Sequence, residues 1–136
     1  MRRWNGWGDE QIESQLPAGA QNMLETLVGR PSPQQNADRQ ELIARVPDSR
    51  VAAADVLIST DSGDRLDHAH GQSFPDWVAV RCATLKRFPD AVARPESESR
   101  LEEVLSFADK NQMIVVPYGG GTSVVGHLDV PESDAP

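Results

Sequence analysis

The chain has 136 residues, with 13 Lys or Arg against 21 Asp or Glu, so its formal net charge is −8. The length predicts about one domain, and the acidic balance argues against nucleic acid and anionic membranes as partners, because both attract basic proteins. No apolar run is long enough to form a transmembrane segment. The single cysteine, Cys82, excludes an internal disulfide and suits a reducing compartment, so we expect a cytoplasmic protein.

Apolar residues make up 38% of the chain, and 10 prolines and 10 glycines interrupt it. Typical globular domains contain about 45–50% apolar residues. We therefore expect one ordered segment beside long irregular stretches, and not a self-sufficient compact domain.

A short helix is predicted over residues 21–28, within an otherwise irregular N-terminal part. Gly29 stands where a glycine commonly ends a helix. The apolar residues of this helix share one face, and they are Met23, Leu24, Leu27 and Val28.

Three more segments come before residue 68. Residues 38–46 predict a short charged helix, which Pro47 stops because proline cannot continue a helix. Residues 51–58 fit a helix or a strand equally well. Residues 61–67 are rich in Asp and are predicted as a polar turn.

The second half of the chain has clearer signals. Residues 77–80 form a short apolar segment, and residues 88–95 read as a short strand bounded by prolines. A helix follows, with Ser97 or Ser99 as its N-cap and Asn111 as a left-handed stop. Its apolar stripe has the spacing i, i+3, i+4, i+7 and consists of Leu101, Val104, Leu105 and Ala108.

Residues 113–116 are a continuous apolar run, which is typical of a buried strand. The 18 residues from 95 to 112 are enough for a helical crossover between parallel strands. The fold class is therefore α+β: a largely irregular and helical N-terminal region, then a strand-helix-strand unit that ends in a glycine loop.

Three consecutive glycines, Gly119 to Gly121, follow this predicted strand. Glycine permits a positive φ and removes the Cβ atom, so another group can approach the backbone closely. Successive backbone N–H groups in such a loop can bind an anion. Thr122 and Ser123 add two hydroxyl donors, so the loop predicts a pyrophosphate site.

Other glycine motifs fit less well. A Walker A loop needs Lys and Ser or Thr where this chain has His127 and Leu128, and a Rossmann fingerprint needs Gly where it has Val124. A plain tight turn of glycines remains the alternative without a ligand.

Residues 116–124 resemble the first FAD-binding loop of the vanillyl-alcohol-oxidase superfamily, whose domain is called PCMH-type. Residues 88–116 look like the small N-terminal FAD subdomain of that superfamily. Three further motifs are similar to its alkyldihydroxyacetonephosphate-synthase-like group, which includes bacterial FAD-linked oxidases. These motifs are Trp-Asn-Gly-Trp-Gly at residues 4–8, the Arg-Leu-Asp-His-Ala-His-Gly segment at 65–71, and Arg-Phe-Pro-Asp at 87–90.

The resemblance implies a family-specific, partly irregular region over residues 1–63 and a truncated PCMH-type FAD-binding domain over residues 64–136. It implies FAD as cofactor, with the loop in contact with the FAD pyrophosphate. The cofactor-binding residues implied in this way are Pro117, Tyr118, Gly119, Gly120, Gly121, Thr122, Ser123, Val124 and His127.

The resemblance further implies that this chain is the N-terminal part of a flavin-dependent oxidoreductase, which can be a homodimer when complete. The substrate would be a small hydroxy acid or a glycerol-phosphate-type molecule. The chain alone is expected to be inactive, because the catalytic groups over the flavin ring would lie outside it. No residue of this chain is therefore predicted to be catalytic.

Some alternatives stay open at this stage. His127 can carry the flavin covalently, line it, or be structural, and Cys82 is more typical of a buried, inert thiol. His68 and His70 lack the spacing of helical zinc ligands, so no metal is expected. The alternative function is a non-catalytic remnant that binds a nucleotide or a partner protein. Its interaction surface would consist of Trp77, Leu101, Leu105 and Val115.

Overall fold

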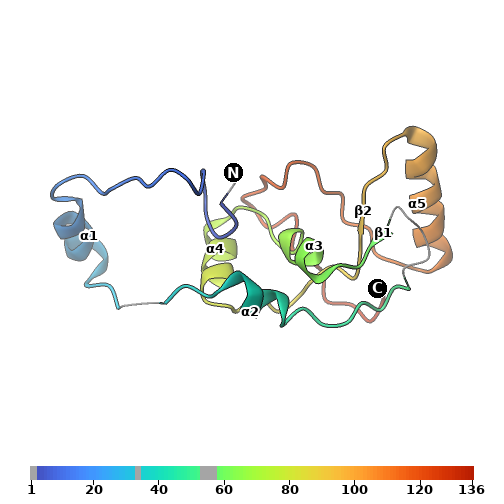
Figure 1. Cartoon of the computed structure of the whole chain (residues 1–136), viewed down its shortest axis with the longest axis horizontal. Coiled ribbons are helices and arrows are strands. Elements are labelled where there is room, and N and C mark those ends of the chain that lie inside the picture. Colours follow the sequence, from blue (N-terminus) through green and yellow to red (C-terminus); the bar gives the residue numbers. More distant parts are fainter. Residues whose placement is uncertain (1–2, 33–34, 53–57) are drawn as a thin grey trace.

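The structure is a computed structural model that describes residues 3–32, 35–52 and 58–136. The described chain contains helices and one small antiparallel sheet, joined by long irregular segments (Figure 1), which confirms the predicted α+β class. Strand β1 pairs with β2, so that Ile58 lies opposite Ala93 and Ser59 opposite Val92. The elements in chain order are α1 (Ala20–Val28), α2 (Arg39–Ile43), β1 (Ile58–Ser59), α3 (Ser62–Asp67), α4 (Phe74–Arg81), β2 (Val92–Ala93) and α5 (Glu98–Lys110).

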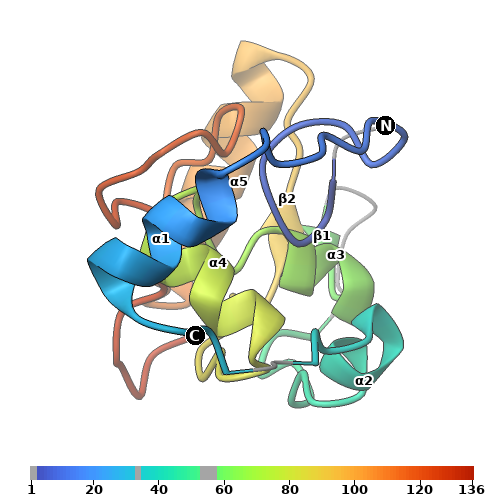
Figure 2. The same ribbon diagram turned by 90° about the vertical axis from the view of Figure 1, so that its left-hand side faces the viewer.

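Helix α1 lies on an arm that leaves the body of the molecule and returns to it before α2 (Figure 1). Figure 2, which views that end, shows α1 in front of α4. The helix predicted over residues 21–28 is confirmed, and Gly29 ends it at φ +85° with its N–H donated to the Glu25 carbonyl. No residue of α1 is buried, and Leu27 and Val28 are 70% and 80% exposed. Its apolar face is therefore not part of the core.

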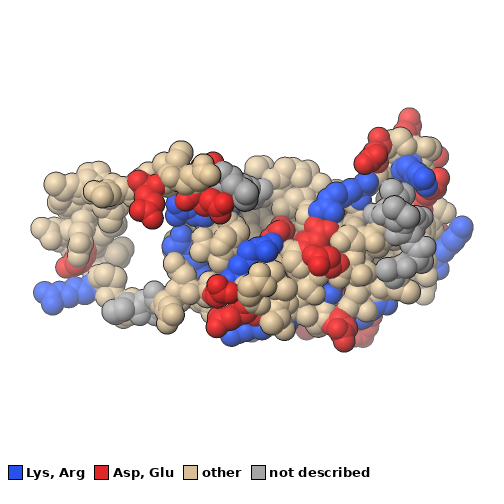
Figure 3. Space-filling view, viewed as in Figure 1, with Lys and Arg blue, Asp and Glu red and all other residues tan. Residues whose placement is uncertain are grey.

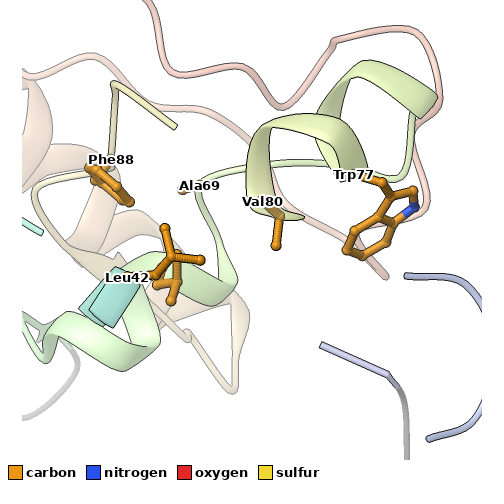
Figure 4. Close-up of a cluster of buried hydrophobic side chains, with 6 residues drawn as sticks. Leu42, Ala69, Trp77, Val80 and Phe88 are labelled. Carbon is orange, nitrogen blue, oxygen red and sulfur yellow. The ribbon is translucent and has the colours of Figure 1, made fainter. Parts of the chain in front are cut away.

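The core lies between α2, α3, α4 and the segment before β2 (Figure 4). Local signals set the ends of these helices. The Asp38 side chain accepts from the Gln40 N–H and begins α2, which is shorter than predicted. Ser73 and Asp76 form a capping box at the start of α4, so the apolar segment at 77–80 is helical. The buried residues of the core are Leu42, Leu66, Ala69, Trp77, Val80 and Phe88.

Residues 61–67 were predicted as a turn, and that prediction is wrong. The Asp61 side chain accepts a hydrogen bond from the Asp64 N–H and thereby caps α3. Burial of Leu66 and Arg65 then stabilises this short helix. The Arg65 guanidinium donates to the carbonyl oxygens of Pro47 (2.7 Å) and Pro89 (2.6 Å), which joins three segments of the chain. The polar composition of this segment gave no indication that Arg65 and Leu66 are buried.

The helix predicted after residue 95 is confirmed as α5, with two corrections at its ends. Ser97 is the N-cap, since its hydroxyl accepts from the Arg100 N–H, and Ser99 lies within the helix. The left-handed residue after the helix is Gln112 (φ 54°), whereas Asn111 has φ −101°. Of the strand predicted over residues 88–95, only the two residues of β2 are a strand in the structure.

Residues 113–116 do not form the predicted buried strand, and the described sheet contains no parallel crossover. The reason is non-local: β2 pairs with β1, and the Ile114 N–H instead donates to the carbonyl oxygen of Pro136 (2.9 Å). Ile114 and Val115 are 46% and 48% exposed. Together with α5 and β2 they line an apolar cavity of about 580 Å³.

Other expectations have mixed outcomes. The Cys82 thiol is exposed and not buried, because it follows the last turn of α4. Residues 53–57 of the ambiguous segment lie outside the described residues, and Ile58 begins β1.

The division into residues 1–63 and 64–136 stays a prediction. None of the described helices combines the length and apolar content that crossing a membrane requires.

Charged side chains of both signs are interspersed over the body of the molecule (Figure 3). Helix α3 contributes two ion pairs at its surface: Asp67 with Arg39 (2.8 Å) and Asp64 with both terminal nitrogens of Arg94. The hydrogen bonds from Arg94 lower the pKa of Asp64 from 3.8 to about 2, against the opposing effect of burial. This pair links α3 to the segment that follows β2.

The Asp64–Arg94 pair predicts a specific loss of stability in acid. Because the folded-state pKa of Asp64 lies below its ordinary value, the stabilisation is complete above about pH 4 and disappears as the pH falls through 2. We expect Asp64→Asn to lower the free energy of unfolding at pH 7 by up to about 1 kcal/mol. The variant should also show a shallower loss between pH 4 and 2, measured by urea unfolding followed by circular dichroism. Glu103→Gln, in an exposed pair on α5, is the control, and equal acid dependence in Asp64→Asn and wild type would contradict this.

Candidate functional site

The glycine loop, residues 117–124, is irregular and passes the end of α3 and the start of α4. Its side chains divide into two groups by exposure. Tyr118 and Ser123 are half-buried, and Gly121 is buried. The exposed members are Pro117, Gly119, Gly120, Thr122 and Val124. Buried or half-buried residues of the loop are thus separated by exposed ones.

Tyr118 makes the first attachment of the loop. Its hydroxyl donates to the Asp67 carbonyl oxygen (3.3 Å), and its ring centroid lies 4.5 Å from that of His68. The same ring occupies the space beside Gly121, where an added Cβ would overlap the Tyr118 hydroxyl. Gly121 also has a φ of +65°, which non-glycine residues rarely adopt. The fold itself therefore requires glycine at position 121.

Ser123 makes the second attachment. Its carbonyl oxygen accepts a hydrogen bond of 2.6 Å from the Gln72 N–H. Gly71 permits this approach, because a Cβ on Gly71 would lie 2.5 Å from the same oxygen. Both attachments use the segment that joins α3 to α4, residues 67–72, which we call the platform.

Gly119 and Gly120 lie between the two attachments and have room around them. An added Cβ would meet no atom within 4 Å at Gly119, and at Gly120 it would meet only the Thr122 methyl group, 3.7 Å away. The described protein therefore gives no steric reason for glycine at these two positions. A group that approaches the backbone from outside would supply that reason.

The Ser123 hydroxyl oxygen is buried and has no hydrogen-bond partner among the described residues. A buried polar group without a partner costs about 1–3 kcal/mol. The backbone of the same residue is held by the platform, because the Ser123 carbonyl oxygen accepts from the Gln72 N–H. The loop therefore contains a hydroxyl without a partner and, three to four residues before it, two glycines with open space.

His127 lies outside this arrangement, exposed in the turn that follows the loop. Gly126 makes that turn with φ +77°, and the Asp129 N–H donates to its carbonyl oxygen (3.2 Å). The three readings of His127 therefore stay predictions. Among the described residues, no group of three or more His, Cys, Asp or Glu side chains is arranged to hold a metal ion.

Sequence reasoning selected the loop and missed the residues that hold it. Gly71 and Gln72 carried no chemical signal, because their role is a contact with a residue about 50 positions away. The similarity of residues 65–71 to a family motif was the available hint. The motif at 4–8 also reaches this site, since the Trp7 indole N–H donates to the Gln72 carbonyl oxygen (3.0 Å).

Comparison with known proteins confirms the resemblance that these motifs predicted. A solved structure of an alkyldihydroxyacetonephosphate synthase matches 98% of this chain with a TM-score of 0.76 and 19% sequence identity. The chain has the fold of one part of that synthase. The match covers 31% of the solved synthase chain. No family model matches the chain.

Curated sequences agree with the structural comparison. An alkyldihydroxyacetonephosphate synthase of Trypanosoma brucei brucei is 27% identical over 158 aligned residues, which cover 93% of this chain and 26% of that synthase. A mitochondrial D-lactate dehydrogenase (cytochrome) of Arabidopsis thaliana is 33% identical over 76 residues, which cover 55% of this chain and 12% of that enzyme. The chain thus spans about a quarter or less of these two relatives.

The contact between Gly71 and Ser123 predicts the effect of one added methyl group. We expect Gly71→Ala to push the Ser123 carbonyl away from Gln72 and to lower the free energy of unfolding by about 1–3 kcal/mol. Gly119→Ala, which meets no neighbour, is the matched control and should change stability by less than about 0.5 kcal/mol. Urea unfolding of both variants measures this, and equal losses in the two would contradict the contact.

Proposed function

We propose that residues 117–124 bind the pyrophosphate of FAD, as part of a flavin-dependent oxidoreductase related to the alkyldihydroxyacetonephosphate synthases. The observation that carries this proposal is a buried Ser123 hydroxyl without a partner in the same loop as two glycines whose Cβ positions are open. The resemblance of the loop to a known FAD-binding loop supplies the identity of the ligand.

The loop has the donors that a pyrophosphate needs. Gly119, Gly120 and Gly121 are three successive glycines, and runs of successive backbone N–H groups can bind anions. The Thr122 and Ser123 hydroxyls add two donors at the end of this run. Because Gly119 and Gly120 carry no side chain, a phosphate oxygen can come within hydrogen-bond distance of the backbone.

The other residues of the proposed site have supporting roles. Pro117 directs the loop away from residues 113–116, and Tyr118 and Val124 flank the nucleotide. His127, exposed in the following turn, is included in the proposal as a residue that lines the cofactor. The flavin supplies the redox chemistry, so this chain contributes binding and orientation and no catalytic side chain.

The substrate of the complete enzyme is proposed from the two kinds of relative. One is a synthase of an alkylated dihydroxyacetone phosphate and the other a D-lactate dehydrogenase, so the candidates are a glycerol-phosphate-type molecule and a hydroxy acid. The chain alone is inactive in this proposal. A cytoplasmic location and a homodimeric complete enzyme stay predictions.

A non-catalytic partner-binding module is the second candidate, and a specific observation favours it. Leu101, Leu105 and Val115 are 44%, 46% and 48% exposed and line the apolar cavity beside α5. Trp77, which was expected on the same surface, is buried in the core at 4% exposure. This surface would be retained in a chain that binds no flavin.

Titration of the full chain with FAD, followed by the quenching of flavin fluorescence, tests the proposal. We expect micromolar binding by the wild type. Ser123→Ala should weaken binding by about five- to tenfold, because it removes a donor, while leaving stability unchanged or slightly higher. Gly120→Glu should abolish binding, because it adds a carboxylate where the phosphates would lie.

Two controls separate binding from folding. Ser49→Ala removes a hydroxyl that is bonded to the Asp90 carbonyl (2.7 Å) and the Val51 N–H (3.0 Å), so it should lower stability and leave FAD affinity unchanged. Leu27→Glu adds the same charge as Gly120→Glu, but on the exposed helix α1. A well-folded chain without flavin affinity would contradict the proposal and favour the partner-binding module.

A further inference from the structure

We propose that Trp7 is a positioning residue for the glycine loop, which it reaches through Gln72 without contacting the cofactor. The inference rests on the proposed function for what the loop binds. The link itself is structural, because it consists of two consecutive hydrogen bonds between segments that are far apart in the sequence.

Gln72 is held on both sides. Its N–H donates to the Ser123 carbonyl oxygen (2.6 Å), and its own carbonyl oxygen accepts from the Trp7 indole N–H (3.0 Å). The platform residue therefore cannot shift toward or away from the loop without breaking one of these bonds. Ser123 carries the unpartnered hydroxyl, so a shift of its backbone would move the donor that the ligand uses.

The segment that carries Trp7 is itself fixed. The Asn5 carbonyl oxygen accepts from the Arg81 side chain of α4 (2.8 Å), and the Arg3 N–H donates to the Gly8 carbonyl oxygen (3.0 Å). Gly6 lies so close to Arg81 that an added Cβ would be 3.0 Å from its guanidinium. The turn around Trp7 is thus attached to α4 on one side and closed on itself on the other.

Burial alone does not account for Trp7. The side chain is 57% exposed, and its ring meets Trp77 edge-on at a centroid distance of 6.4 Å. Trp4, three residues earlier, packs instead against the hydrophobic core. The indole N–H of Trp7 joins the N-terminal segment to the platform, which assigns the residue a role in positioning.

The test compares Trp7→Phe with Trp4→Phe in the full chain. Trp7→Phe keeps an aromatic ring beside Trp77 and removes the N–H donor. We measure amide hydrogen exchange at Gln72 and at the loop, with the amides of α5 as an internal reference for global unfolding, and then FAD affinity by fluorescence. Trp7→Phe should speed exchange at Gln72 and the loop relative to α5, and weaken FAD binding by about three- to tenfold. Trp4→Phe should produce no such local change.

The two readouts separate the possible failures. If Trp7→Phe leaves both Gln72 exchange and FAD affinity unchanged, the positioning role is overturned. If it speeds exchange equally at Gln72 and in α5, the residue is merely structural and the role is also overturned. If the wild type binds no FAD, the proposed function fails, and local acceleration at Gln72 alone would still support Trp7 as the residue that positions the loop.

Discussion

The hydrogen bond between the Gln72 N–H and the Ser123 carbonyl oxygen holds two distant parts of this chain together at 2.6 Å. Two backbones can approach this closely because Gly71 has no side chain. The loop is also attached through Tyr118, whose hydroxyl donates to the Asp67 carbonyl oxygen at the other end of the same platform. Gly119 and Gly120 lie between these attachments with open space at their Cβ positions, and the remaining features of the site depend on that geometry.

The platform is itself stabilised by interactions around α3 and α4. Arg65 is buried and bonds to two carbonyl oxygens, and Arg94 pairs with the preceding residue, Asp64. The capping box of Ser73 begins α4 directly after the platform. Residues 61–67, whose sequence alone indicates a turn, thus contain the helix that supports the platform. By contrast, α5 and residues 113–116 surround an apolar cavity, where this chain offers little to cover their apolar side chains.

The sequence predicted those features that depend on neighbouring residues. Gly29 at the end of α1, the Ser97 cap of α5 and the apolar face of α1 are local, although the left-handed residue after α5 is Gln112 and not Asn111. The glycine loop was selected by its chemistry and by resemblance. Features that depend on distant partners were missed. Residues 114–116 are β-branched, but a strand needs a neighbouring backbone, and β2 pairs with β1. Gly71, Gln72 and the indole N–H of Trp7 act only through contacts across the fold, so no local pattern could reveal them.

The most direct test of the account is to map the FAD site on the chain by NMR, using the backbone amide signals of the ¹⁵N-labelled protein. The account predicts that FAD shifts the amides of Gly119 to Ser123 and of Gln72, and leaves those of α1 in place. Shifts confined to α5 and residues 113–116, around the apolar cavity, would contradict it. In that case the glycine loop would be a structural turn, and the ligand of this protein would have to be sought at the cavity.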